Sequence, residues 1–449
     1  MKLKKPSLTN LLPSRRLGGS LGHVFSLMKE DKLYSAMYIL GTAIAIAFTM
    51  LIAEIYYIKI ADIAPEVNRS KMYILSHYQI TEESGGRQSF SPHEFTKDNY
   101  FELFKKMKSP ECVCAELPDN YSGHDHYMKL PDGFHDQKVS IRLVDPDYFQ
   151  FFHFNFIQGV PFTQDDFDNA RPLVVITEEI SQKLFGKGKK AMGKTLRMDN
   201  KEYRICGVIE TPSVLAENCT ADIWFPFSLE GVVNYWHYPV WMYFSVPKAK
   251  REAFMQELKG VQARFNSMEE ENPIQNIQND VEKYTDHTLK YMSYLFNTGL
   301  GTDNIFGTFA IVIMLLLLVP ALNLCGMVAS RMNRRLPEMA IRKAFGAKRR
   351  TLLGQVIMEN LTLTLIGGAV GLCLAWAALY GWRDWVFHAF DFLKAKYGQV
   401  PIIKGEMFFG PAIFLVALLV STILNVLAAA LPAWLSLRKP IVESMMTKK

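Results

Sequence analysis

Residues 311–350 have the sequence IVIMLLLLVPALNLCGMVASRMNRRLPEMAIRKAFGAKRR, and its change of character at the midpoint decides the fold. Residues 311–330 contain no charged side chain, whereas residues 331–350 contain eight Lys and Arg. About 20 apolar residues are enough for a helix to cross a bilayer, and Lys and Arg gather on the cytoplasmic side of such a helix. We therefore predict a transmembrane helix that ends in a basic cytoplasmic segment.

Three more apolar stretches are long enough to cross a membrane. The four predicted transmembrane helices are residues 36–58, 305–329, 352–380 and 408–435. The first stretch follows a leader of 35 residues and no small-residue cleavage site precedes the polar chain, so we expect it to be retained as an anchor. An ordinary soluble enzyme is disfavoured, because the apolar residues are bunched into these runs.

The distribution of charge predicts the orientation. Seven basic residues precede position 36 and four follow position 435, whereas residues 59–303 carry 27 basic and 35 acidic side chains, a net charge of −8. By the positive-inside rule, the cytoplasmic segments are the N-terminal residues 1–35, the loop 330–351 and the tail 436–449, and the extracytoplasmic segments are residues 59–304 and the short loop 381–407. The basic flanks follow the membrane topology, so we predict no nucleic-acid partner.

The predicted fold is therefore a multi-pass α-helical membrane protein with both termini in the cytoplasm and a large α+β domain outside, between helices 1 and 2. Capping patterns within this domain predict a helix from Ser91-Pro92 to Lys108 and a second helix between Thr177 and Gly186. A hairpin is expected around Asp199 and Asn200, and a helix over residues 248–268. Residues 282–299 form an amphipathic run that is either a motion-transmitting stalk or a plain connector.

Gly188, Gly193, Lys194 and Thr195 match the phosphate-loop pattern G-x-x-x-x-G-K-[ST]. That loop binds phosphate only between a buried strand and a helix N-terminus. Here a polar helix precedes the motif and a hairpin strand follows it, on the side of the membrane where ATP is scarce. We interpret the match as a basic turn and not as a nucleotide site.

The cysteines and histidines of the outer domain suggest two alternatives. Cys112, Cys114, His124 and His126 are residue types that bind soft metals, but their spacing fits no common zinc module. In an oxidising compartment Cys112, Cys114, Cys206 and Cys219 could instead form disulfides, and the sequence favours this interpretation over metal binding. We interpret Cys325 and Cys373 as packing residues, and we predict no metal site and no catalytic residue.

The basic segment contains an apolar stripe at helical spacing, formed by Leu336, Met339, Ala340, Ala344 and Phe345. A short helix of this kind could lie on the membrane or dock in a partner's groove. A solvated, positively charged loop is an equal alternative on physical grounds. In the helix that follows, Gly367 and Gly371 would allow close helix approach, within this chain or with a second copy.

Two further polar or helix-bending positions stand out near the spans. Glu359 is nine residues beyond Arg350, about 13 Å along a helix, and a carboxylate there should be paired or water-linked. Pro320 is expected to bend the second helix, with Asn323 near the freed backbone groups.

Residues 337–347, PEMAIRKAFGA, resemble the signature E-x-x-x-R-(R/K)-A-(I/F)-G-A of MacB/FtsX-like permeases of ATP-binding-cassette (ABC) systems. Glu359 and Gly367-Gly368-x-x-Gly371 are similar to the third membrane helix of that family. Residues 432–433 and 440–444 resemble its ending, with Ser444 in place of the usual Ala. Outer-domain segments similar to the family's extracytoplasmic core are 147–149, 159–162, 184–186, 193–194 and 203–208.

This resemblance implies a coupling helix that docks on a separate cytoplasmic ABC ATPase, which binds ATP and Mg²⁺, so we expect this chain to be a non-catalytic subunit without a cofactor of its own. The implied coupling residues are Leu336, Glu338, Met339, Ile341, Arg342, Lys343, Phe345 and Gly346. The implied membrane-packing residues are Glu359, Gly367, Gly368, Gly371 and Pro320. Further expected partners are a second permease chain, membrane lipids and a periplasmic or outer-membrane protein.

The resemblance favours the permease subunit of an exporter or lipoprotein-release system in a bacterial inner membrane, which passes ATP-driven motion to the outer domain. A transmembrane regulator of an extracytoplasmic enzyme, such as a cell-wall hydrolase, is the alternative. A membrane-anchored sensor without ATP coupling is a third hypothesis.

Overall fold

The computed structural model describes residues 31–84, 87–118, 125–131, 135–213, 216, 218–229, 240–268, 273–274, 276–286, 305–382 and 411–438. The chain divides into two compact units. The helical unit contains the described residues before Tyr57 and after Ile305, and the outer domain contains those from Tyr57 to Ile305.

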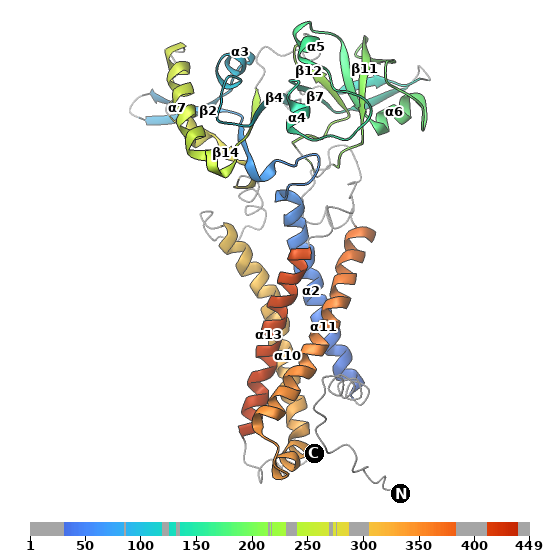
Figure 1. Cartoon of the computed structure of the whole chain (residues 1–449), viewed down its shortest axis with the longest axis vertical. Helices are drawn as coiled ribbons and strands as arrows, with labels where there is room; N and C mark the ends of the chain where they lie inside the picture. The colour runs from blue at the N-terminus through green and yellow to red at the C-terminus, as the bar shows by residue number, and fades with distance from the viewer. Residues whose placement is uncertain are drawn as a thin grey trace. The chain divides into compact units, whose positions relative to one another are not determined.

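The helical unit is built from four long helices (Figure 1), which are α2 (Lys32–Ile60), α10 (Ile305–Ala344), α11 (Arg349–Gly381) and α13 (Pro411–Arg438). Helices α2, α11 and α13 contain windows that are long and apolar enough to span a membrane. Helix α10 includes the predicted second span, and its crossing stays a prediction. Their outward faces carry large apolar side chains, as on α13, where Leu419, Ile423 and Leu427 are exposed at helical spacing.

The segment predicted as a basic loop is largely helical. Helix α10 continues without a break through Pro320 to Ala344, so the helix predicted at Leu336 is the last part of α10 and not a separate element. Only residues 345–348 separate α10 from α11. Leu, Met, Arg, Lys and Ala dominate residues 336–344 and favour helix, which accounts for this extension.

The outer domain is organised around one mixed sheet, in which the described strands follow the order β14-β1-β13-β4-β7-β12-β9-β11-β10-β5-β6 and β8 pairs with β11. The strands are β1 (Met72–Leu75), β4 (Cys112–Pro118), β5 (His126–Lys129), β6 (Asp136–Val139), β7 (Ile141–Val144), β8 (Phe156–Gly159), β9 (Leu173–Thr177), β10 (Thr195–Met198), β11 (Lys201–Ile209), β12 (Ile223–Pro226), β13 (Trp241–Ser245) and β14 (Glu282–Lys283). A separate hairpin joins β2 (Tyr78–Ser84) to β3 (Arg87–His93).

The outer domain also contains nine helices among the described residues. They are η2 (Arg69–Lys71), α3 (Lys97–Asn99), η3 (Tyr100–Phe104), α4 (Tyr148–Phe151), α5 (Gln164–Asp168), α6 (Glu178–Phe185), η5 (Lys248–Lys250), α7 (Arg251–Met268) and α8 (Ile277–Asp280). The longest, α7, buries Phe254, Leu258, Val261 and Phe265 at helical spacing. The ring centroids of Phe254 and of Phe244 in β13 lie 5.3 Å apart, so aromatic packing joins α7 to the sheet.

Several local predictions for this domain are confirmed. Thr177 caps α6 by accepting a hydrogen bond from the Ile180 amide, and Gly186 ends the helix with φ +89°. The β10–β11 hairpin turns at Asp199 and Asn200, both with positive φ, as a two-residue turn between twisted strands requires. Helix η5–α7 covers residues 248–268 as predicted.

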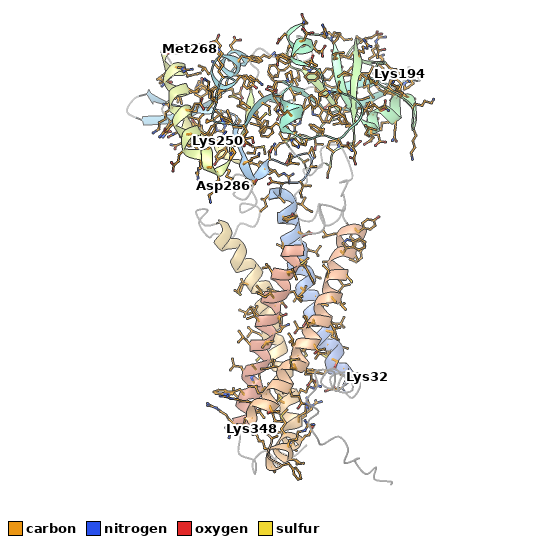
Figure 2. All side chains as sticks on the ribbon, viewed as in Figure 1. Lys32, Lys194, Lys250, Met268, Asp286 and Lys348 are labelled. Atoms are coloured by element: carbon orange, nitrogen blue, oxygen red, sulfur yellow. The ribbon has the colours of Figure 1, made fainter. Side chains whose placement is uncertain are left out.

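One local prediction is wrong. The helix predicted from Ser91 begins instead at Lys97, capped by Thr96, because Ser91 and Pro92 belong to β3 and pair with Ile80 and Gln79 of β2. The amphipathic run at 282–299 begins with strand β14, in which Glu282 and Lys283 pair with β1, and its role as a stalk or a plain connector stays a prediction. Its remainder after Asp286 (labelled in Figure 2) lies outside the described residues.

Candidate functional site

The corner between α10 and α11 is a defined cap and not an open loop. Gly346 has φ +90°, the Gly346 amide donates to the Lys343 carbonyl, and the Ala347 amide donates to the Arg342 carbonyl. These two bonds form a Schellman motif, which satisfies carbonyls at a helix end and needs a residue with positive φ. The Gly-Ala pair of the sequence signature therefore reverses the chain after Phe345 and allows α11 to begin after Lys348 (Figure 2).

The predicted apolar stripe divides between the inside and the surface of the helical unit. Leu336, Met339 and Ala340 are buried, and Met339 packs in the cluster that contains Leu352 and Val356 of α11. Phe345 is 83% exposed and Ile341 is 44% exposed. An outside partner can therefore touch Phe345 and Ile341, whereas Leu336 and Met339 hold α10 against its own unit.

The charged coupling residues are anchored within the chain. Arg342 pairs with Glu338 at 2.6 Å and donates to Gln355 of α11 at 3.0 Å, and Lys343 Nζ donates to the Leu437 carbonyl of α13 at 2.5 Å. Lys348, Arg349 and Arg350 are exposed after the turn. The corner thus presents two apolar side chains beside a row of cations, on a base tied to α11 and α13.

Glu359 is the centre of a buried charge cluster. It is 1% exposed and accepts a hydrogen bond from Arg335 Nη1 at 3.0 Å, and Arg331 Nη1 contacts its other oxygen. Arg331 also lies over the Tyr34 ring of α2, 4.2 Å from its centroid. A carboxylate in this position needs compensating charge, and two arginines one turn apart on α10 supply it.

Sequence reasoning predicted that Glu359 would be paired or water-linked, but it did not identify the partners. The available signal was the spacing of Arg331 and Arg335, which places both on one face of a helix. Beyond this cluster Tyr34 donates to Asn360 at 3.3 Å, and Thr364 lies 3.2 Å from the Tyr38 hydroxyl and 3.3 Å from Asn425 of α13. These polar contacts connect α2, α11 and α13.

The glycines of α11 lie against other helices of the same chain. A Cβ on Gly371 would lie 2.7 Å from the Ala43 carbonyl oxygen of α2, and one on Gly367 would lie 2.9 Å from Thr42 Cβ. A Cβ on Gly368 would lie 2.5 Å from Leu418 of α13. These residues permit close approach of α2 and α13 to α11 within one chain. The side chain of Pro320 lies outside the described residues.

The outer-domain candidates do not form the sites considered. Cys112, Cys114, Cys206 and Cys219 are all free thiols, so the predicted disulfides are absent among these four residues. Burial raises the pKa of Cys112 and of Cys206 to about 12. His126 contacts Asp199 at 3.1 Å, and no group of three metal-binding side chains occurs in the part of the chain that the structure describes. His124 lies outside that part.

The phosphate-loop match has the predicted non-binding context. Helix α6 precedes it and strand β10 follows it, so no helix begins directly after Gly193 and Lys194. The Lys194 ammonium instead lies 4.4 Å from the centroid of the Phe185 ring.

Two family profiles match the chain along most of its length. Residues 35–261 match the MacB-like periplasmic core domain, and residues 309–441 match the FtsX-like permease C-terminal region. Together they cover α2, most of the outer domain and the three helices that follow it.

Curated relatives include macrolide export ATP-binding/permease proteins. MacB 1 of Yersinia pestis bv. Antiqua (strain Antiqua) is 24% identical over 252 residues, which are 56% of this chain and 37% of the relative. MacB of Escherichia coli (strain K12) is 23% identical over 314 residues, 69% of this chain and 44% of the relative. The chain thus spans about two fifths of the length of these relatives.

Solved structures with similarity to the chain include two extracytoplasmic regions. The periplasmic region of MacB from Actinobacillus actinomycetemcomitans matches with a TM-score of 0.34 and 15% identity, over 47% of this chain and 91% of that one. The extracellular domain of the noncanonic ABC-type transporter YknZ from Gram-positive bacteria matches with a TM-score of 0.33 and 15% identity, over 45% and 100%. Because the core-domain profile alone spans half of the sequence and the permease profile follows it in order, the chain belongs to the MacB/FtsX-like family of ABC transporter permeases.

Proposed function

We propose that this chain is the permease subunit of an exporter or lipoprotein-release system in a bacterial inner membrane, and that it passes motion from a separate cytoplasmic ABC ATPase to its outer domain. The observation that carries the proposal is the surface of the α10–α11 corner, where Phe345 and Ile341 are exposed close in sequence to three exposed basic side chains, those of residues 348–350. Contacts of Glu359, Arg342 and Lys343 hold this corner to the neighbouring helices. An anchored corner transmits force, whereas a loose loop would absorb it.

The proposed mechanism needs no chemistry in this chain. The ATPase would bind ATP and Mg²⁺, bind the α10–α11 corner and displace α10 and α11. Because Arg331 and Arg335 of α10 both hold Glu359 of α11, the two helices would move together. Two permease chains, identical or paralogous, would pair around the ATPase dimer.

The second candidate function is regulation of an extracytoplasmic enzyme by the same motion. The large outer domain favours transport or release over this regulation.

The docking surface is tested by Phe345→Ser, with Phe345→Leu as the matched control. The side chain is 83% exposed, so both variants should fold and insert normally. Loss of a hot-spot aromatic side chain costs an interface about 2 kcal/mol or more. Phe345→Ser should therefore raise the Kd for an ABC ATPase about thirtyfold and reduce its co-purification. Phe345→Leu keeps the apolar contact and should retain most of the ATPase.

Mass spectrometry of the complex purified from native membranes gives the readout. Equal ATPase recovery with Phe345→Ser and the unmodified protein would remove the corner as the docking site. Absence of any ABC ATPase from the unmodified protein, even after cross-linking at Lys343, would contradict the proposed function and favour the anchored sensor.

A further inference from the structure

Arg69 occupies an unusual position at the start of the outer domain. It is 2% exposed, and its Nε donates to Glu66 Oε2 at 2.5 Å. Its Nη1 donates to the Ala61 carbonyl at 3.1 Å and to the Ile58 carbonyl. The last carbonyls of a helix have no partner within the helix, so this guanidinium caps the C-terminal end of α2.

The same side chain also reaches the segment by which the chain leaves the domain. Its guanidinium carbon lies 5.9 Å from the centroid of the Tyr284 ring, directly after β14. Strand β14 pairs with β1, with Lys283 opposite Tyr73. The entering and leaving segments are therefore neighbours, and Arg69 contacts both of them.

Glu66 ties this junction to the body of the domain. Its Oε1 accepts the Asn218 amide at 2.8 Å, and it is 1% exposed. Nearby, the Asn68 side chain donates to the Phe151 carbonyl at 2.6 Å and the His153 amide donates to the Pro65 carbonyl at 2.9 Å. The connector from Ile58 to Lys71 is thus fixed at several points to α4 and to the segment before β12.

A buried ion pair is a poor way to stabilise a fold, because desolvation offsets most of its attraction. Arg69 instead joins three segments, because it contacts the end of α2, Glu66 of the connector and Tyr284 after β14. We propose that Arg69 is a positioning residue that clamps the end of α2 and the Tyr284 segment to the outer domain, so that a displacement of the last turn of α2 moves the whole domain. The role of this clamp in transmitting motion rests on the proposed function. The contacts of Arg69 that form the clamp do not depend on it.

Hydrogen exchange on the full chain in lipid nanodiscs tests the clamp. The variant is Arg69→Gln, and the control is Arg142→Gln, which breaks another buried pair, with Glu116, between β7 and β4. Arg69→Gln should raise exchange about tenfold in peptides covering residues 57–71 and 281–286 and leave β4 and β13 protected. Arg142→Gln should raise exchange around β4 and β7 and leave both connectors unchanged.

Two results would overturn the clamp. One is unchanged exchange of both connectors in Arg69→Gln. The other is an equal rise across the whole domain in both variants, since the pair would then be only a stabilising contact. If Arg69→Gln does not insert, Arg69→Lys replaces it, because one ammonium cannot serve Glu66 and two carbonyls together, and the same connector peptides should exchange faster.

The role in transmission needs a second readout. With the ATPase bound, a dye is attached at Lys194→Cys in a chain whose exposed Cys373 is replaced by Ser. Its ATP-dependent fluorescence change should fall about threefold or more in Arg69→Gln while ATP hydrolysis persists. Opened connectors with an unchanged dye response would refute the positioning role. No ATP response in the unmodified complex would refute the proposed function, and the exchange result would still decide the clamp.

Discussion

At the residue scale, Glu359 explains why the helical unit tolerates charge in its interior. Its two oxygens face Arg331 and Arg335, so each buried group has a partner on a different helix. Breaking such a cluster leaves uncompensated charge, which is more costly than never having placed it there.

We therefore expect Glu359→Gln to destabilise the helical unit by about 3 kcal/mol or more, because Arg331 and Arg335 lose their buried carboxylate and keep only Asp31 and Glu338, each 3.7 Å away. The measurement is thermal or denaturant unfolding in detergent. Glu338→Gln is the control, since Glu338 is exposed and its pairs with Arg342 at 2.6 Å and with Arg335 at 3.7 Å should together contribute at most about 1 kcal/mol. Equal losses of unfolding free energy in the two variants would show that the buried Glu359 contributes no more to stability than the exposed Glu338.

The glycines of α11 provide a second residue-scale prediction. Gly371→Ala would place a methyl group 2.7 Å from the Ala43 oxygen, so it should destabilise the unit by about 1–3 kcal/mol through forced separation of α2 and α11. A Cβ on Gly354, in the same helix, meets no atom within 4 Å, so Gly354→Ala should instead stabilise by about 0.5–1 kcal/mol. Unfolding measurements that give both changes the same sign would contradict this packing.

At the element scale, the α10–α11 turn depends on backbone conformation more than on contacts. Gly346 has φ +90° and a Cβ there would meet nothing, so Gly346→Ala should cost about 1–2 kcal/mol by backbone strain alone. Gly326→Ala within α10 is the control, because a Cβ there also meets nothing and the helical backbone favours Ala. Chemical unfolding separates the two, and no loss for Gly346→Ala would show that the turn rearranges freely.

Element prediction from sequence succeeded where a local signal decides the structure. Thr177, Gly186 and the Asp199-Asn200 turn each fix their own backbone, so α6 and the β10–β11 hairpin were predicted correctly. Ser91-Pro92 carries a similar capping signal but lies in a strand, because pairing with β2 outweighs the local preference. The spacing of Arg331 and Arg335 places them on one helix face, but it could not identify Glu359 of another helix as their partner or bring Tyr284 to Arg69.

At the scale of the whole molecule, the stability of the outer domain should depend on pH through a buried thiol. Burial raises the pKa of the Cys206 thiol to about 12, whereas an unfolded thiol titrates near 8.5. A raised pKa contributes stability below the unfolded value that is lost as the pH rises toward the folded one.

We therefore expect the outer domain of the full chain to lose stability between about pH 9 and pH 12, in part through this thiol. Cys206→Ser should reduce the steepness of that loss, because Ser does not titrate there and can keep the bond to the Val174 carbonyl. Urea unfolding of the full chain followed by tryptophan fluorescence at pH 8 and pH 10 gives the comparison, since the signal includes Trp224, which is buried in the outer domain. An unchanged pH slope in the variant would mean that other groups carry the effect.

The pairing of β1 with β14 has an evolutionary consequence. A domain that enters and leaves through adjacent strands behaves as an insertion, since its removal leaves two chain ends that a short linker can join. Large and small outer domains can then be exchanged at this one seam without redesign of the helices on either side. Changes to the outer domain beyond this seam would accordingly leave the helices and their Glu359 cluster intact.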